Sequence, residues 1–468
     1  MNKYKTLAGN TLIFAIGSFG AKFLSFLLVS LYTGCLTEAE YGIQNLIYDT
    51  GNILVPIVSF AMSDAVVRYG LDKNYDKRKV YTIAIVMMAM GMTVFAILSP
   101  TINLVSKLRG YGFLLYAFVY CSCFRQAASQ FVRSLGYVKL FAADGIFSTL
   151  TIVLFNVIFM VWLKMGVTGY MLSVILSDTC SFLLLTLIAG LHKYLDLKYL
   201  DKKLMKDMLR YSIPMIPALI MWWIISSSDR YVLAYMVDDS ATGIYSLANR
   251  IPTLLMLVST MFYQAWQMSA ITENEDKQVS KFYAQVFSAY SSIMFIGSAG
   301  IMLFGKLILM LLTIFSKNAE GYMEAFHYSP ILIAAVLFQC FCQFLSTIYS
   351  ARKKTVNSFW TSFIPAALNI VLNLLLIPKY GIYGASYATL ASYFVCFAVR
   401  IFDTRRYIRF KVAFGTLIVN TVIIVVMMLI ASAEPKLCYL WLSLLFILIA
   451  LLNFKAIIRT AKKIFAKE

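Results

Sequence analysis

Apolar stretches long enough to cross a bilayer recur along this chain, and basic residues are distributed unevenly among the loops between them. A helix needs roughly 20 apolar residues to cross the hydrocarbon core, and 14 such stretches lie between Thr11 and Leu452. Of the 41 Lys and Arg residues, 28 fall in alternate loops and at the two ends, and 7 fall in the intervening loops. This positive-inside pattern predicts that both termini face the cytoplasm.

Composition excludes several other classes of protein. The 468 residues are 61% hydrophobic, and no polar segment is long enough to form a soluble domain of useful size. The net charge of +19 would indicate nucleic-acid binding in a soluble protein. Here most of the excess charge lies in predicted cytoplasmic loops, where it sets orientation and contacts anionic headgroups, so we expect no nucleic-acid partner.

Nothing in the sequence predicts an enzyme. The eight cysteines are scattered without the spacing of a metal site. There is no phosphate-binding loop of the G-x-x-x-x-G-K-[ST] kind. We therefore expect no catalytic residues, no cofactor and no metal. An intramembrane glycan polymerase or ligase is the alternative outside transporters.

The pattern predicts an all-α polytopic membrane protein with 14 transmembrane helices. The predicted spans are 8–34, 43–69, 79–105, 111–135, 140–163, 168–191, 208–235, 241–268, 280–304, 327–350, 356–378, 381–402, 412–432 and 437–454. The predicted domains are a six-helix bundle at 1–191, a basic cytoplasmic linker at 192–210, a second six-helix bundle at 211–408, and two additional helices with a basic cytoplasmic tail at 409–468.

Glycine-containing junctions repeat in the two predicted bundles. Residues 40–43 join spans one and two, and residues 241–245 join spans seven and eight. Residues 166–170 and 381–385 play the same part between spans five and six and between spans eleven and twelve. Because an even number of spans separates the repeats, both halves have the same orientation. Parallel repeats in a pseudo-two-fold arrangement are typical of alternating-access transporters.

Six basic residues lie within or at the edges of the predicted spans: Lys22, Arg68, Arg125, Arg230, Arg250 and Arg400. A cation at the bilayer centre costs on the order of 2.5–3.5 kcal/mol, so such residues suggest a polar cavity with an anionic occupant. Lys22, Arg125 and Arg250 are the strongest candidates for lining it. The alternative is that they pair with buried acids, for which the candidates are Asp49, Asp144 and Asp178. We interpret Arg400 as an interfacial anchor and Asp229 with Arg230 as an outer-interface pair.

Further polar side chains accompany these cations. Asn45, Asp49 and Asn52 form a stripe on one helical face. Asp64 and Arg68, four residues apart, are expected to pair with each other. The predicted substrate-binding residues are Lys22, Asn45, Asp49, Asn52, Arg68, Arg125, Gln126 and Arg250. The candidates for coupling to an ion are Asp49, Asp64 and Asp178.

Two features suggest how the bundles could move and hold together. When the Gly42 and Gly243 turns are superposed, Asp49 and Arg250 occupy equivalent positions, which predicts an acid and a base facing each other across the cavity. Asn369 and Asn373 are interpreted as interhelical hydrogen-bonding residues. The prolines expected to bend helices are Pro214, Pro217, Pro252 and Pro365.

Several runs of the second half resemble the polysaccharide flippases of the multidrug/oligosaccharidyl-lipid/polysaccharide exporter superfamily. They are residues 211–217 (YSIPMIP), 228–233 (SDRYVL), 243–248 (GIYSLA) and 381–385 (GIYGA). The resemblance covers essentially the whole chain. It implies two six-helix bundles around a cavity that opens alternately to each side. Spans thirteen and fourteen would then form a groove for a lipid tail.

The resemblance also implies a substrate and a location. The substrate would be an undecaprenyl-diphosphate-linked oligosaccharide, moved from the inner to the outer leaflet of the bacterial cytoplasmic membrane for surface polysaccharide assembly. Membrane lipids, a proton or sodium ion, and a polysaccharide polymerase are further candidate partners. A lipid-linked peptidoglycan precursor flippase and a cation-coupled multidrug exporter of the same superfamily remain alternatives.

Overall fold

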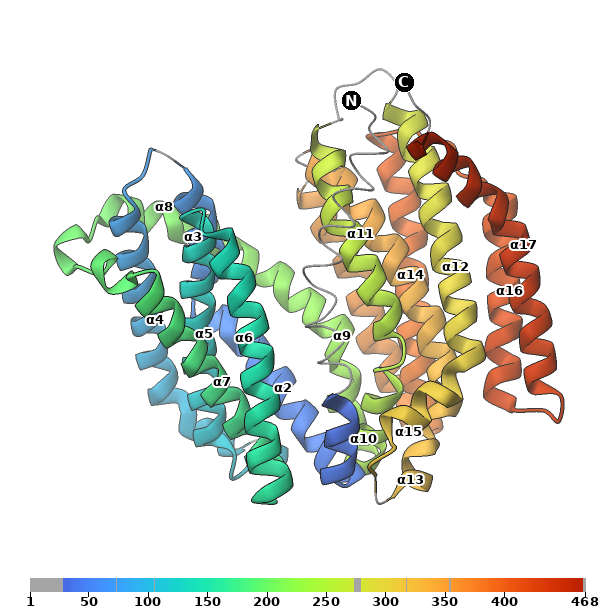
Figure 1. Ribbon diagram of the computed structural model, residues 1–468, viewed down its shortest axis with the longest axis horizontal. Helices are drawn as coiled ribbons and strands as arrows, with labels where there is room; N and C mark the ends of the chain where they lie inside the picture. The colour runs from blue at the N-terminus through green and yellow to red at the C-terminus, as the bar shows by residue number, and fades with distance from the viewer. Residues whose placement is uncertain are drawn as a thin grey trace. The chain divides into compact units, whose positions relative to one another are not determined.

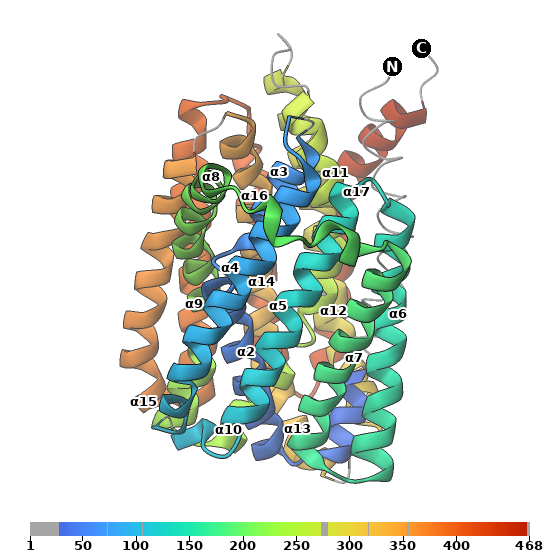
Figure 2. The same cartoon turned by 90° about the vertical axis from the view of Figure 1, so that its left-hand side faces the viewer.

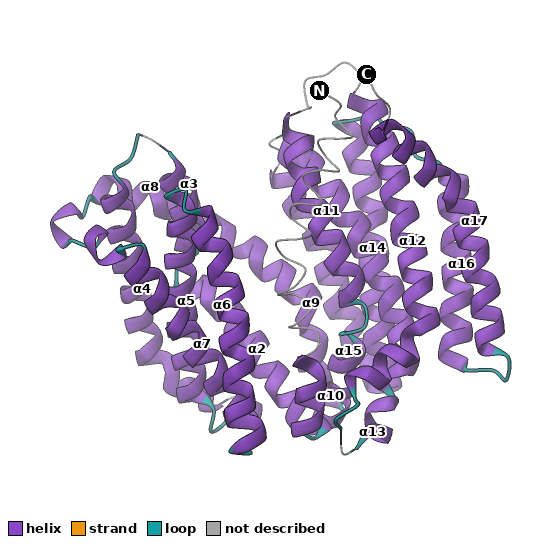
Figure 3. Cartoon of the chain, viewed as in Figure 1, coloured by secondary structure: helices purple, strands orange, loops and turns teal. Residues whose placement is uncertain are grey.

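The computed structural model describes residues 28–72, 74–104, 106–272, 279–316, 318–352 and 355–465, and within these ranges it contains helices but no strand (Figure 3). In this part of the chain, eight helices are long and apolar enough to cross a membrane, or nine if a bent pair counts as one span. The protein is therefore a multi-pass helical membrane protein. The number of 14 spans stays a prediction.

The described chain divides into two compact units (Figure 1). The first unit comprises Leu31–Ser227, and the second comprises Ser228 onward together with the described residues before Leu31. The helices that lie wholly in the first unit are α2 (Glu38–Val58), α3 (Met62–Leu71), α4 (Lys77–Leu98), α5 (Gly112–Ser134), α6 (Val138–Asn156), α7 (Gly166–Ile188) and α8 (Lys202–Ser212). Figure 2 shows α5, α6 and α7 running side by side.

Helix α9 (Ile216–Met236) contains the division between the two units. The remaining helices of the second unit are α10 (Asp239–Ala248), α11 (Thr253–Thr272), α12 (Val279–Leu312), α13 (Ala319–Met323), α14 (Ala325–Ala351), α15 (Thr355–Asp403), α16 (Phe414–Ala433) and α17 (Cys438–Phe465). The predicted domain bounds, with a linker at 192–210, stay a prediction.

Equivalent capped starts open α2 and α10. Thr37 caps α2 in a capping box with Glu40, and the Asp238 side chain accepts from the amide of Ala241 to cap α10. Such caps satisfy amides that have no partner inside the helix. The segments 40–43 and 241–245, which were expected to join spans, instead lie inside α2 and α10, and each starts two residues after its helix begins.

The second repeated junction is reproduced in the backbone. Gly166 and Gly381 both adopt positive φ, of 55° and 54°. Three residues later, a side chain at Gly169 would lie 3.0 Å from the carbonyl oxygen of Phe159, and one at Gly384 would lie 2.5 Å from that of Leu376. The first glycine of each pair thus makes the turn, and the second permits close packing.

Breaks in the helices only partly follow the prolines. The chain bends by 52° between α2 and α3, where Phe60 and Ala61 adopt positive φ. Pro252 lies in the break between α10 and α11, as expected. Pro365 lies inside α15 without a break, and α15 instead folds back at Gly381. A bend at Pro365 stays a prediction.

The basic linker is attached to the first unit by polar contacts. The Lys79 ammonium lies 3.0 Å from the Asp201 carboxylate, and Asp201 also caps α8. The Thr82 hydroxyl donates to the carbonyl of Tyr194 at 3.0 Å. In the second unit, α16 and α17 are joined by reciprocal hydrogen bonds between Asn420 and Asn453, of 3.1 and 2.9 Å.

Candidate functional site

A cluster of charged and hydroxyl side chains lies where α5, α6 and α7 meet in the first unit. We call Ser122, Arg125, Asp144, Asp178 and Ser181 the charged cluster. Arg125 Nη1 donates to Asp178 at 2.9 Å, and its Nη2 lies 3.8 Å from the Asp144 carboxylate. Its Nε donates to Ser181 at 3.0 Å. Ser122 donates to Asp178, and Ser181 donates to Asp144.

The spacing of residues on two helices builds this cluster. Ser122 and Arg125 are three residues apart on α5, and Asp178 and Ser181 are three residues apart on α7, so each pair shares one helix face. Asp144 and Asp178 are buried, whereas the Arg125 side chain is 28% exposed. The guanidinium compensates two carboxylates that would be costly inside a membrane protein.

These contacts bear on the two sequence-based interpretations of Arg125, which are pairing with buried acids and lining a substrate cavity. Of the three acids named as alternative partners, Asp144 and Asp178 both lie against it. Arg125 is therefore engaged within its own unit in this conformation. An anion reaching it would have to compete with two carboxylates already in place. Asp178, a candidate for ion coupling, is likewise part of this ion-paired network.

The other predicted residues of the first unit differ in their exposure. Asn45 and Asp49 are buried on α2, and the Asn45 amide donates to the carbonyl of Tyr41 at 2.7 Å. Asn52, Arg68 and Gln126 are exposed. In the polar stripe on α2, Asn45 and Asp49 are therefore buried, whereas Asn52 is exposed.

Two further predictions concern the Asp64–Arg68 pair and Lys22. Asp64 and Arg68 are both exposed, and no ion pair joins them in the described part of the chain, so the expected local pair was wrong. Exposed charges four residues apart gain little from holding a fixed geometry. Lys22 lies outside the described residues.

Asp49 and Arg250 have different backbone environments. Asp49 is on the helical part of α2, and its carbonyl accepts from the indole of Trp223 at 2.8 Å. Arg250 lies in the turn between α10 and α11, where its amide donates to the carbonyl of Leu247 at 2.9 Å. They belong to separate units, and their pairing stays a prediction.

A second polar cluster surrounds one buried carboxylate in the second unit. Asp229 on α9 is 2% exposed. Tyr245 on α10 donates to it at 2.5 Å, and Thr389 and Asn373, both on α15, donate to it as well. Asn369 accepts from Asn373 at 3.0 Å and from Ser228 at 3.1 Å. We call Ser228, Asp229, Tyr245, Asn369, Asn373 and Thr389 the acidic cluster.

The donors of the acidic cluster are all neutral. The charge of Arg230, the next residue along α9, also acts on this carboxylate. Two buried amide atoms, Asn369 Nδ2 and Asn373 Oδ1, lack a hydrogen-bond partner in the described part of the chain. A buried carboxylate whose hydrogen-bond donors are all neutral is costly to keep ionised, so the site suits a proton or a small cation. The surrounding hydroxyl and amide oxygens are of the type that hard cations prefer.

Sequence reasoning placed Asp229 at the outer interface, and this was wrong. Asp229 followed a long apolar run near the end of the predicted span 208–235, which suggested an exposed position. In the structure α9 packs this turn against α10 and α15, which supply hydroxyl and amide donors. The spacing of Asn369 and Asn373 was the available signal. Their interpretation as interhelical hydrogen-bonding residues is confirmed.

Arg400 was expected to anchor at the interface, and it is instead 1% exposed. Its guanidinium donates to the carbonyl of Cys342 at 2.9 Å, and to the hydroxyls of Ser362 and Thr361 at 2.7 and 3.3 Å. Neutral acceptors on α14 and α15 therefore replace water around this cation.

Comparisons with known proteins agree with this fold. The chain is 26% identical over 262 residues to an uncharacterized membrane protein of Methanocaldococcus jannaschii, covering 53% of this chain and 61% of that protein. It is 26% identical over 167 residues to the probable flippase AglR of Haloferax volcanii, covering 35% of this chain and 34% of that one. The chain thus spans less than two thirds of either relative.

Solved structures share the fold over most of the chain. The lipid II flippase MurJ, in an inward closed conformation, matches with a TM-score of 0.72 at 16% identity, over 96% of this chain and 98% of that one. An inward-facing multidrug resistance MATE family transporter of the MOP superfamily matches with a TM-score of 0.67 at 15% identity, over 82% and 94%. The family described as polysaccharide biosynthesis protein matches residues 7–267, more than half of the chain, and the protein belongs to that family.

Proposed function

We propose that this protein is a flippase that moves undecaprenyl-diphosphate-linked oligosaccharides from the inner to the outer leaflet of a bacterial cytoplasmic membrane. The observation that carries the proposal is the family match over residues 7–267. The MurJ-like fold and the flippase relative support it. The transport mode would be alternating access, with both termini in the cytoplasm and the product used in surface polysaccharide assembly.

Recognition of the carrier diphosphate is proposed for Lys22, Arg125 and Arg250. A diphosphate is strongly anionic, and guanidinium groups bind phosphate oxygens through paired hydrogen bonds. Arg125 is partly exposed but engaged by Asp144 and Asp178, so substrate binding would require exchange of carboxylate for phosphate. Such an exchange can shift a conformational equilibrium only if the two conformations bind the substrate with different affinity. Asp49, Asn45, Asn52, Arg68 and Gln126 stay candidates for contacts to the glycan.

Coupling to a proton or sodium gradient is proposed for Asp229, ahead of the sequence-based candidates Asp49, Asp64 and Asp178. The acidic cluster supports this choice, since it combines a buried carboxylate with neutral donors and two buried amide atoms without partners. Binding and release of a cation would change the charge buried in the second unit by one. Asp64, in contrast, is exposed and has no such surroundings.

Reconstituted flipping tests the substrate and the coupling together. The full chain in proteoliposomes should move a fluorescent undecaprenyl-diphosphate-linked oligosaccharide to the leaflet reached by a membrane-impermeant quencher. An imposed proton or sodium gradient should accelerate the movement. Asp229→Asn should abolish the response to the gradient while the protein remains folded, whereas the matched variant Asp64→Asn should keep it.

Different results would reject different parts of the proposal. No movement of the labelled oligosaccharide, together with movement of a lipid-linked peptidoglycan precursor, would replace the substrate and retain the flippase. Loss of the gradient response in Asp64→Asn but not in Asp229→Asn would reject coupling at the acidic cluster. Export of cationic drugs without lipid movement would favour the multidrug exporter, whose fold the chain shares at a TM-score of 0.67.

A further inference from the structure

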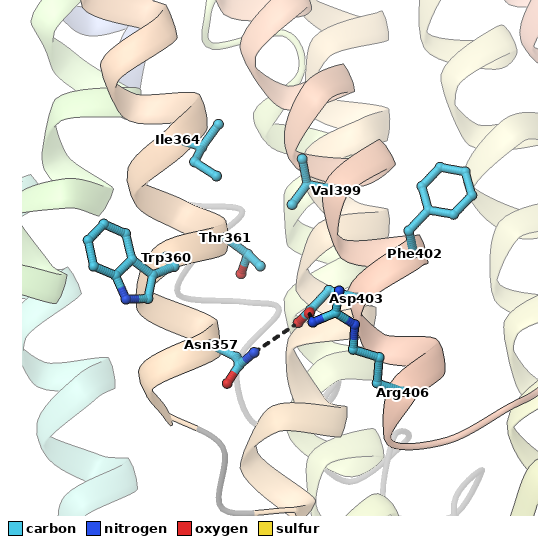
Figure 4. Close-up of a pocket in the computed structure, with 8 residues that line it drawn as sticks. All are labelled: Asn357, Trp360, Thr361, Ile364, Val399, Phe402, Asp403 and Arg406. Carbon is cyan, nitrogen blue, oxygen red and sulfur yellow. Dashed lines mark hydrogen bonds and ion pairs between the residues drawn. The ribbon is translucent and has the colours of Figure 1, made fainter.

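A groove opens between the two arms of α15, and its lining changes from apolar to polar along its length. It has a volume of about 450 Å³. Figure 4 shows Ile364 and Val399 at one end, and Asn357 and Arg406 at the other. Aromatic rings of Trp360 and Phe402, 55% and 64% exposed, flank it. Exposed aromatic residues of this kind are typical of the membrane–water interface.

The polar end holds a carboxylate that accepts two hydrogen bonds and an exposed cation that forms only a long ion pair with it. Asp403 accepts from the Tyr349 hydroxyl at 2.8 Å and from the Asn357 amide at 3.4 Å. Arg406 Nη1 lies 3.6 Å from the same carboxylate, too far for a good hydrogen bond. The Arg406 side chain is 77% exposed, and its N–H groups make no hydrogen bond to a described residue.

The surroundings of this end are strongly basic. Residues 404–411 carry Arg405, Arg406, Arg409 and Lys411 and no acid. Arg405 is occupied by aromatic rings, since its guanidinium lies 4.9 Å from the ring centre of Phe414. Arg400 lies buried behind the groove and contacts Thr361, a groove residue. The charges of Asp403 and Arg406 offset each other in the lining, and the buried Arg400 adds a positive charge behind it, so the polar end carries net positive charge.

We propose that this groove binds an anionic phospholipid of the surrounding membrane. Its phosphate would contact the Arg406 guanidinium and the second amide N–H of Asn357. An acyl chain would lie between Trp360 and Phe402 and continue over Ile364 and Val399. The groove offers few polar groups to recognise a glycan, which favours a simple phosphodiester lipid over the lipid-linked oligosaccharide. The site shares no residue with either polar cluster and does not depend on the proposed transport substrate.

Native mass spectrometry of the purified full chain, after exchange into phosphatidylglycerol-containing micelles, tests this site. Arg406→Ala should reduce retained phosphatidylglycerol about five-fold, the factor expected for one surface cation near an anionic headgroup. Arg409→Ala is the matched control, because Arg409 is exposed on the same basic segment and does not line the groove. Equal retention in the two variants would overturn the proposal.

A fluorescence measurement locates the lipid independently of folding effects. Brominated phosphatidylglycerol should quench wild-type fluorescence more than that of Trp360→Phe, and the difference should shrink in Arg406→Ala. Absence of a difference between wild type and Trp360→Phe would place the lipid elsewhere. Displacement of the quencher by undecaprenyl phosphate, but not by unlabelled phosphatidylglycerol, would assign the groove to the isoprenoid carrier and reject the phospholipid.

Discussion

The two units bury carboxylates in opposite electrostatic settings. In the first unit, Asp144 and Asp178 share one guanidinium, and serine hydroxyls complete the network. In the second unit, the groups that donate hydrogen bonds to Asp229 are hydroxyls and an amide, all of them neutral. Acids that are ion-paired with a guanidinium suit stable packing and exchange with an anion. An acid held by neutral donors suits binding of a mobile cation.

This difference predicts different responses to neutralisation. Removing the cation from the charged cluster leaves buried carboxylates without compensation, which is destabilising. Replacing Asp229 by Asn removes a buried charge, and the lower desolvation cost offsets the hydrogen bonds that the amide loses, so the free energy of unfolding should change little. In the second unit, a neutralising substitution should therefore change transport without changing stability. In the first unit, it should change both.

The largest effect on stability is expected for Arg125→Leu. The free energy of unfolding should fall by about 3 kcal/mol, as is typical when one partner of a buried ion pair is removed. Thermal unfolding of the purified protein in detergent would measure it. Arg133→Leu, two turns along α5, is the matched control, because Arg133 is exposed and its guanidinium lies over the Phe141 ring at 5.7 Å.

A double variant sharpens this prediction. Arg125→Leu combined with Asp178→Asn should recover part of the lost stability, since one uncompensated carboxylate is then gone. Strictly additive losses would show that Arg125 and Asp178 do not interact energetically. The proposed electrostatic difference between the two units would then be wrong.

Much of the fold could be predicted from the sequence, because helix length and junction chemistry are local properties. The start of α10 at Asp239 and the positive φ of Gly166 and Gly381 follow from short motifs around each position. The identities of neighbouring helices are not local. Whether Asp229 faces lipid or Thr389 depends on how α9 and α15 pack. The sequence near Asp229 does not indicate this packing.

The charged residues illustrate the same limit. The sequence named Asp144 and Asp178 as partners for Arg125 without deciding between pairing and a cavity. Arg400 carried no such signal, because its partners are a backbone carbonyl and two hydroxyls. Neutral acceptors are too common in a sequence to identify the cation that they will bind. Burial of a single charge is therefore harder to predict than pairing of opposite charges.

A smaller effect is expected for Tyr245→Phe in the acidic cluster. The variant removes one of three donors to Asp229 and should lower the free energy of unfolding by about 1.5 kcal/mol, the lower range for hydrogen bonds to a charged group. Tyr383→Phe is the control, because its hydroxyl makes no hydrogen bond to a described residue. Equal losses in the two variants would mean that Asp229 does not depend on this donor.

The smallest effect is expected for Asp201→Asn on the basic linker. This variant measures how much an exposed ion pair contributes to stability. A hydrogen bond from Lys79, together with backbone amides of α8, lowers the pKa of the Asp201 carboxyl below its ordinary value of 3.8. A lowered pKa means that the ionised form stabilises the folded state above the unfolded-state pKa, and that this gain is lost as pH falls through the folded-state pKa. The melting temperature of the variant should therefore be slightly lower than that of wild type at neutral pH, and the gap should close below pH 3.8. High salt should also shrink the gap, because exposed pairs are screened. A melting-temperature difference as large as that of Arg125→Leu, or one that persists in acid, would contradict this prediction. It would mean that exposed charges contribute as much to stability as buried ones, which the comparison of the two units excludes.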